Sequence, residues 1–130
     1  MKLHHVGYLV KDIRKSMTAF EALDYQLDGN IFFDEDRKSD ICFMRSERDA
    51  VELIQPRTDS EIFPLLKKFR NSPYHLCFEV DDLDAEKNRL QSRGFLLFKD
   101  SSPARAISDS ARVAFLNHPA AGIVELVQLE

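Results

Sequence analysis

A chain of 130 residues with 44% apolar and 31% charged residues has the composition of an ordinary globular protein, and its length fits one domain. No apolar run approaches the roughly 18 residues of a membrane span, the first 20 positions carry charges where a signal peptide needs an apolar segment, and two cysteines are too few for a disulfide scaffold. The net charge of −4 without a basic cluster argues against nucleic-acid binding. We therefore expect a cytoplasmic globular protein with no membrane or nucleic-acid partner.

The predicted elements begin with a strand over residues 3–10, which is rich in β-branched and aromatic side chains. Asp12 is placed to cap the helix that follows, and the run Asp28-Gly29-Asn30 is expected to end a strand. A short connector helix is expected to end near Phe69, and Asp82 is placed to cap a second long helix. The remaining strand candidates are residues 30–33, 40–46, 50–55, 74–80, 95–98, 111–117 and 122–129.

The two halves of the chain repeat one pattern. His5-Val-Gly-Tyr-Leu-Val-Lys-Asp aligns with His75-Leu-Cys-Phe-Glu-Val-Asp-Asp, and Ala50-Val-Glu-Leu-Ile-Gln aligns with Ile123-Val-Glu-Leu-Val-Gln. Each half reads as a strand with a histidine, a helix and three strands, with a glutamate on the last strand. The repeat predicts a single domain over 1–130, made of a first module (1–57), a connector helix (58–73) and a second module (74–130).

Two histidines and two glutamates are predicted to share one face of the strands. Side chains alternate along a strand, so the residues that flank His5 and His75 form apolar sets that point away, toward the helices. Glu52 and Glu125 lie among apolar neighbours on both faces of their strands, which is costly unless the carboxylate is paired or binds a cation. Any one of these residues alone is more simply an ordinary polar strand residue, but the repeated set of four indicates one shared site.

The chemistry of this set favours a divalent metal ion. Two neutral imidazoles and two carboxylates together carry a charge of −2, and nitrogen and oxygen ligands without a thiolate suit Zn, Co, Ni, Mn or Fe(II). Four protein ligands leave positions open on a six-coordinate ion, as a catalytic site requires. Such an ion could bind a carbonyl oxygen while a neighbouring base takes the adjacent proton.

At these residues the chain resembles the vicinal oxygen chelate superfamily of glyoxalases, bleomycin-resistance proteins and extradiol dioxygenases, and within it the methylmalonyl-CoA epimerases. The resemblance implies an α+β fold, in which two tandem βαβββ modules form a curved mixed sheet around a metal cleft, and it implies a homodimer. It also implies metal ligation by His5, Glu52, His75 and Glu125. The stretches that carry it are Leu3-His-His-Val-Gly-Tyr-Leu-Val, Val51-Glu-Leu-Ile-Gln-Pro, Tyr74-His-Leu-Cys-Phe-Glu-Val, Arg112-Val-Ala-Phe-Leu-Asn-His-Pro and Gly122-Ile-Val-Glu-Leu-Val.

The resemblance names the candidate catalytic residues Glu125, Glu52 and Asp36. Glu125 corresponds to a glutamate that leaves the metal to move a proton, and Asp36, or else Glu35, is the nearest match to the second base that epimerisation needs. Epimerases carry glutamine at the Glu52 position, whereas enzymes similar to glyoxalase I carry glutamate. The loop at 106–110 lacks the family's glycines, which argues against a CoA ester as substrate, since glycine permits close approach of the backbone to a phosphate.

Three functions remain open from the sequence. The first is a metal-dependent epimerase or isomerase, or a lactoylglutathione lyase of the glyoxalase type, that removes a proton next to the carbonyl of a small acyl thioester or related α-carbonyl substrate. The second is an extradiol-type dioxygenase with Fe(II) held by His5, His75 and Glu125. The third is a metal-free binding module similar to bleomycin-resistance proteins, although such proteins typically lack these ligands.

Overall fold

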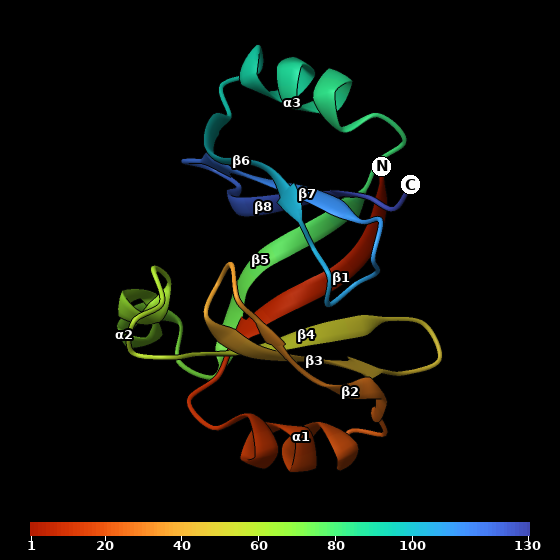
Figure 1. The fold of residues 1–130 in the computed structure, drawn as a ribbon, viewed down its shortest axis with the longest axis vertical. Helices are drawn as coiled ribbons and strands as arrows, with labels where there is room; N and C mark the ends of the chain where they lie inside the picture. The colour runs from red at the N-terminus through yellow and green to blue at the C-terminus, as the bar shows by residue number, and fades with distance from the viewer. The chain divides into compact units, whose positions relative to one another are not determined.

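The computed structural model describes all 130 residues, Met1–Glu130, and the chain divides into two compact units. Residues 5–74 form the amino-terminal unit, and residues 75–130 together with 1–4 form the carboxy-terminal unit (Figure 1). The predicted succession of a strand, a helix and three strands is confirmed in both halves of the chain. No helix is long and apolar enough to cross a membrane.

The amino-terminal unit contains a four-stranded mixed sheet in the order β2-β3-β4-β1. β1 and β4 run parallel, whereas β2, β3 and β4 are antiparallel neighbours. Its elements are β1 (Lys2–Leu9), α1 (Ile13–Glu21), β2 (Gln26–Asp34), β3 (Ser39–Arg45), β4 (Ala50–Pro56), the 3-10 helix η1 (Phe63–Leu65) and α2 (Leu66–Phe69). α1 covers one face of this sheet (Figure 1), and the buried side chains between them include Val10, Ile13, Met44 and Leu53.

The carboxy-terminal unit repeats this architecture with the strand order β5-β8-β7-β6. β5 and β8 are parallel and the other pairs are antiparallel. Its elements are β5 (Ser72–Glu79), α3 (Leu83–Gln91), β6 (Leu96–Pro103), β7 (Arg112–His118) and β8 (Gly122–Gln128). One apolar cluster that includes Leu83 and Leu126 lies under α3, and a second cluster that includes Val113 and Val127 lies on the opposite face of the sheet.

Each long helix begins at two side-chain acceptors, one local and one from a distant strand. The predicted cap Asp12 accepts from the amides of Arg14 and Lys15 at 3.1 and 3.2 Å, and Gln55 Oε1 at the end of β4 accepts from the Ile13 amide at 2.8 Å. The amino end of a helix leaves its first amides unpaired. The glutamine therefore fixes the helix to the strand that carries Glu52.

The same arrangement of two side-chain acceptors occurs at the start of α3. Asp82 Oδ1 accepts from the Ala85 amide at 3.0 Å, and Gln128 Oε1 accepts from the Leu83 amide at 2.8 Å. The glutamines recognised as equivalent in the sequence repeat thus have one structural role in both units.

Two local predictions were wrong. Asp28-Gly29-Asn30 does not end a strand but lies within β2, where the pairing with β3 shifts register between Asp28 and Phe32. Gly29 has φ of +81°, so the turn-prone residues produce a bulge instead of a chain reversal. The connector helix ends at Phe69, as expected, but it starts only at Phe63, and its α-helical part is the four residues of α2.

Lys87 of α3 has a nearly buried side chain whose ammonium group is paired with two carboxylates. Its side chain is 11% exposed, and its Nζ lies 2.6 Å from Asp100 Oδ1 and 2.8 Å from Asp84 Oδ1, two carboxylates that are largely exposed. The hydrogen bond to Asp100 raises the pKa of Lys87, and the same bond lowers the pKa of Asp100. The aliphatic part of Lys87 is therefore buried while its ammonium group reaches solvent-exposed partners.

Replacing Gln55 with leucine should lower the free energy of unfolding by about 1–3 kcal/mol, because the Ile13 amide loses its acceptor in a partly buried position. Gln128→Leu should cost a similar amount through the Leu83 amide. Urea denaturation measures both, with the exposed Gln91→Leu as control. A loss below about 0.5 kcal/mol for both variants, the range of ordinary surface substitutions, would contradict the structural role.

Lys87→Met should destabilise the protein at neutral pH more than at acid pH. Since the native pKa of Asp100 lies below its ordinary value, the stabilisation is present above that ordinary value and is lost as the pH falls through the lowered one. Unfolding midpoints measured from neutral pH down to about pH 3 test this, with Lys99→Met on β6 as control. A wild-type-to-variant difference that stays constant with pH would argue against the pairing.

Candidate metal centre

In the amino-terminal unit, the structure brings His5 to Glu52. Glu52 on β4 lies opposite Gly7 on β1, so His5, two residues earlier in β1, presents its side chain to the same face. His5 Nε2 is 3.3 Å from Glu52 Oε1, and the two residues are 1% and 0% exposed. The predicted common face of this histidine and this glutamate is therefore observed.

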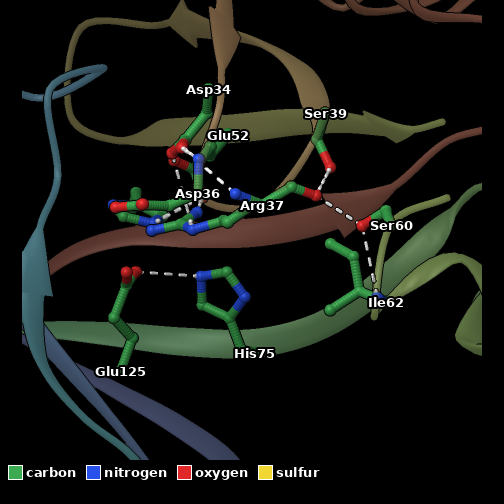
Figure 2. A network of polar contacts seen from close by, with 10 residues as sticks. Asp34, Asp36, Arg37, Ser39, Glu52, Ser60, Ile62, His75 and Glu125 are labelled. Atoms are coloured by element: carbon green, nitrogen blue, oxygen red, sulfur yellow. Dashed lines mark hydrogen bonds and ion pairs between the residues drawn. The ribbon is translucent and has the colours of Figure 1, made fainter.

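The carboxy-terminal unit contains an equivalent histidine–glutamate pair, with the same offset of two residues between the paired strands. Glu125 on β8 lies opposite Cys77 on β5, and His75 stands two residues before Cys77. His75 Nε2 is 3.1 Å from Glu125 Oε1, and both side chains are fully buried (Figure 2). The sequence repeat thus corresponds to a repeated arrangement of a parallel strand pair, a histidine and a glutamate.

A phenylalanine completes each pair. Phe43 on β3 lies opposite Glu52 and meets the His5 ring edge-on at a centroid distance of 5.3 Å. Phe115 on β7 lies opposite Glu125 and meets the His75 ring in the same way at 5.6 Å. These rings limit the orientations of the imidazoles. Sequence reasoning did not assign them to the site, although the repeat of Ile41-Cys-Phe-Met as Val113-Ala-Phe-Leu contained the signal.

The amino-terminal unit adds a buried arginine that sequence reasoning missed. Arg37, in the turn between β2 and β3, is 8% exposed. Its Nη1 lies 3.7 Å from Glu52 Oε1, and its Nε lies 3.7 Å from Oδ2 of the buried Asp34. Asp34 and Arg37 are three positions apart in a polar turn, a spacing too common to indicate a site by itself.

Hydrogen bonds on its backbone hold Arg37 in place. Its carbonyl oxygen accepts from Ser39 Oγ at 2.9 Å and also from Ser60 Oγ, while its amide donates to Asp34 Oδ1 at 3.2 Å (Figure 2). The two serines are buried, so the turn is tied to the connector from inside the unit. The guanidinium is therefore presented to Glu52 by a fixed backbone.

The candidate base Asp36 lies in the same turn but is exposed. Its amide donates to Asp34 Oδ1 at 2.9 Å. The structure thus places Asp36 beside the residues that hold Arg37, and its neighbour Glu35 is exposed as well.

The donor atoms of each pair fit a shared metal ion. Metal–nitrogen and metal–oxygen bonds of about 2.1 Å place two adjacent ligand atoms about 3.0–3.4 Å apart for angles between octahedral and tetrahedral. The observed separations of 3.3 and 3.1 Å lie in this range. Buried imidazole and carboxylate groups are also ligand types that zinc and the neighbouring transition metals accept.

Cys42 does not offer an ionised thiol as a ligand. Cys42 is 1% exposed in the core under α1, and burial, with a smaller contribution from the charge of Glu52, raises its pKa to about 12. Cys42 is therefore a neutral core residue at physiological pH. Cys77 is buried and forms no disulfide.

The fold and the paired residues together define a class of α+β protein, built from two βαβββ units that each bury one histidine and one glutamate on a parallel strand pair. The model of the Glyoxalase/Bleomycin resistance protein/Dioxygenase superfamily matches residues 4–115, and the chain belongs to this superfamily. The family and the fold class expected from the sequence are thus confirmed. No curated protein matches the chain in sequence.

Several solved structures are similar over nearly the whole chain. Methylmalonyl-CoA epimerase from Mycobacterium tuberculosis is 25% identical with a TM-score of 0.83, and the match covers 99% of this chain and 88% of that one. A hypothetical protein from Bacillus halodurans C-125 is 21% identical with a TM-score of 0.85, with coverage of 99% and 94%. A Streptomyces coelicolor methylmalonyl-CoA epimerase in complex with 2-nitronate-propionyl-CoA is 21% identical with a TM-score of 0.80, with coverage of 98% and 94%.

Arg37→Met should lower the free energy of unfolding by about 3 kcal/mol or more, because the substitution keeps an unbranched chain like the aliphatic part of arginine but removes the buried cation beside Asp34 and Glu52. Arg45→Met is the matched control, since the Arg45–Asp28 ion pair is about half exposed and should contribute at most about 1 kcal/mol. Chemical denaturation measures both. Equal losses for the two variants would show that the Arg37 network is not a buried charge network.

Proposed function

We propose that this protein is a metal-dependent isomerase, similar to methylmalonyl-CoA epimerase, that moves a proton at the carbon next to a carbonyl group. His5, Glu52, His75 and Glu125 together hold one divalent ion in this proposal. The observation that carries it is the repeated pair of a buried histidine and a buried glutamate, with donor atoms 3.3 and 3.1 Å apart. Membership in a superfamily that includes glyoxalases and dioxygenases supports it.

The ion would supply a positive charge that polarises the carbonyl oxygen of the substrate and makes the adjacent proton easier to remove. The two imidazoles are neutral donors, and the two carboxylates balance the charge of a divalent cation. The phenylalanine edges against both histidines limit the rotation of the imidazole rings. The surrounding strands exclude water from all four side chains, which strengthens electrostatic interactions at the site.

The carboxylates have different roles in the proposal. Glu52 is held by the Arg37 guanidinium at 3.7 Å and serves mainly as an anchored ligand. Glu125 takes the proton from the substrate carbon, and Asp36, an exposed carboxylate near the same network, returns a proton on the opposite face. Epimerisation requires two such groups, because the proton must leave from one face and arrive at the other.

The substrate class in this proposal is a small acyl thioester or a related α-carbonyl compound. Similar solved structures of methylmalonyl-CoA epimerases are complexes with methylmalonyl-CoA or with 2-nitronate-propionyl-CoA, which supports a thioester. Isomerisation of a hemithioacetal, as in a glyoxalase, is the second candidate, and the carboxylate at position 52 favours it. The proposal includes the homodimer that the family resemblance implies and the cytoplasmic location expected from the composition of the sequence.

Metal analysis and hydrogen exchange test this function together. The purified protein should bind close to one Zn, Co, Ni, Mn or Fe ion per chain, and in D₂O the metal-loaded protein should introduce deuterium next to the carbonyl of an acyl-CoA or a hemithioacetal, offered in parallel. His75→Gln should lower metal affinity by about 10–100-fold or more, by analogy with losses from groups around a metal. Glu125→Gln should abolish exchange through the loss of the base.

His118→Gln is the matched histidine control. His118 Nδ1 accepts from the Ala120 amide at 3.0 Å, and its ring packs against Phe95, so this residue has a local structural role. The control should retain metal affinity. Absence of a bound metal and of measurable affinity for Ni, Co and Zn would overturn the proposal. Oxygen-dependent ring cleavage of a catechol without any deuterium exchange would favour a dioxygenase instead.

A further inference from the structure

A pocket lies in the amino-terminal unit, where the ends of β1 and β4 meet the connector that contains η1 and α2. It has a volume of about 750 Å³, which is within the usual range for small-molecule sites. Four basic residues line it, namely Lys11, Arg57, Lys67 and Arg70, and no acidic residue does. A chain with a net charge of −4 therefore gathers four cations around one hollow.

Three of the four cations have no carboxylate partner. Arg57 donates from Nη2 to Asp40 Oδ1 at 3.2 Å, and its guanidinium lies 3.9 Å from the centroid of the Phe33 ring. Lys11, Lys67 and Arg70 form no ion pair in the structure. Like charges that converge without a counter-charge repel each other, so an anion in the pocket would remove a repulsion as well as form new contacts.

The backbone that carries these cations is held in place. The Lys11 amide donates to Asn71 Oδ1 at 3.1 Å, Leu9 and Arg70 form an isolated β-bridge, and the Arg57 amide donates to the Lys38 carbonyl at 2.9 Å. The end of β1 is thus joined to the end of the connector, and the chain after β4 is joined to the turn before β3. A ligand would have to order the ends of the long side chains but not the chain itself.

The walls of the pocket are partly apolar. Pro56, Phe63, Pro64 and Leu66 line it beside the cations, and Phe63 is 36% exposed. A bare inorganic anion would leave these surfaces in contact with water. The lining therefore fits a molecule with both an anionic group and an apolar part.

This pocket lies at the end of β4, and the candidate metal ligands His5 and Glu52 of the same unit are not among its lining residues. Gln55 lines the pocket, and its side chain turns to the α1 side, where it accepts from the Ile13 amide. Glu52 is three residues earlier, and because side chains alternate along a strand, it projects to the other face. The two features are separate sites within one unit.

We infer that this pocket binds an organic phosphate ester that has an apolar group next to the phosphate. A phosphate monoester carries a charge of about −1.5 to −2 at neutral pH, which suits three uncompensated cations better than a single carboxylate does. Lys67 and Arg70 from the connector and Lys11 from the end of β1 contact the phosphate, and Phe63 and Pro64 cover the apolar group.

Isothermal titration calorimetry with phenyl phosphate tests this site in the full chain at low ionic strength, where screening is weakest. Saturable binding with one molecule per chain is expected, and inorganic phosphate should bind about tenfold more weakly, because it lacks the apolar contact. Lys67→Gln should weaken binding of phenyl phosphate by at least about tenfold, which corresponds to the loss of one charged hydrogen bond.

Lys68→Gln is the matched control, because Lys68 is the next residue in α2 and does not line the pocket; its ammonium lies 5.2 Å from the Phe69 ring centroid. It should change affinity less than about twofold. Lys11→Gln, in a different segment, should repeat the effect of Lys67→Gln, which keeps the test valid if one variant fails to fold. No saturable binding, equal weakening by Lys67→Gln and Lys68→Gln, or equal affinities for phenyl phosphate and inorganic phosphate would overturn the inference.

Discussion

A carboxylate without exposed surface is costly to bury unless a cation or a set of hydrogen-bond donors meets it, and this chain buries one at the same position in each unit. Glu52 and Glu125 are both 0% exposed. In each unit the Nε2 atom of a histidine lies 3.3 or 3.1 Å from this carboxylate, and the histidine stands two residues before the residue that pairs with the glutamate on the parallel strand. The parallel pairing of the first and last strands of each unit therefore determines the geometry of the site.

The rest of each unit supports this strand pair. The glutamine three residues after each glutamate binds the first helix amide, which attaches α1 to β4 and α3 to β8. The phenylalanine opposite each glutamate packs against the histidine. In the amino-terminal unit, Arg37 adds a buried positive charge 3.7 Å from Glu52, so this glutamate suits an anchored role.

The fold brings basic residues together that are scattered in the sequence. The sequence shows no basic cluster and an acidic net charge, yet Lys11, Arg57, Lys67 and Arg70 surround one pocket. These residues are up to 59 positions apart, from 11 to 70, and come together because the connector returns to the end of β1. The connector is thus more than a spacer between the repeats, since it supplies two of the four cations and part of the apolar wall.

The sequence by itself determined the repeated succession of strands and helices, the superfamily and the residues that meet as His5–Glu52 and His75–Glu125. These features are periodic or repeated, and alternation along a strand is enough to assign a face. Only the tertiary structure decided the bulge at Gly29, the burial of Arg37 and the basic pocket. Such features depend on contacts between residues that are distant in the chain, and local sequence patterns do not predict such contacts. In β2, strand pairing with β3 also outweighed the turn propensity of the residues around Gly29.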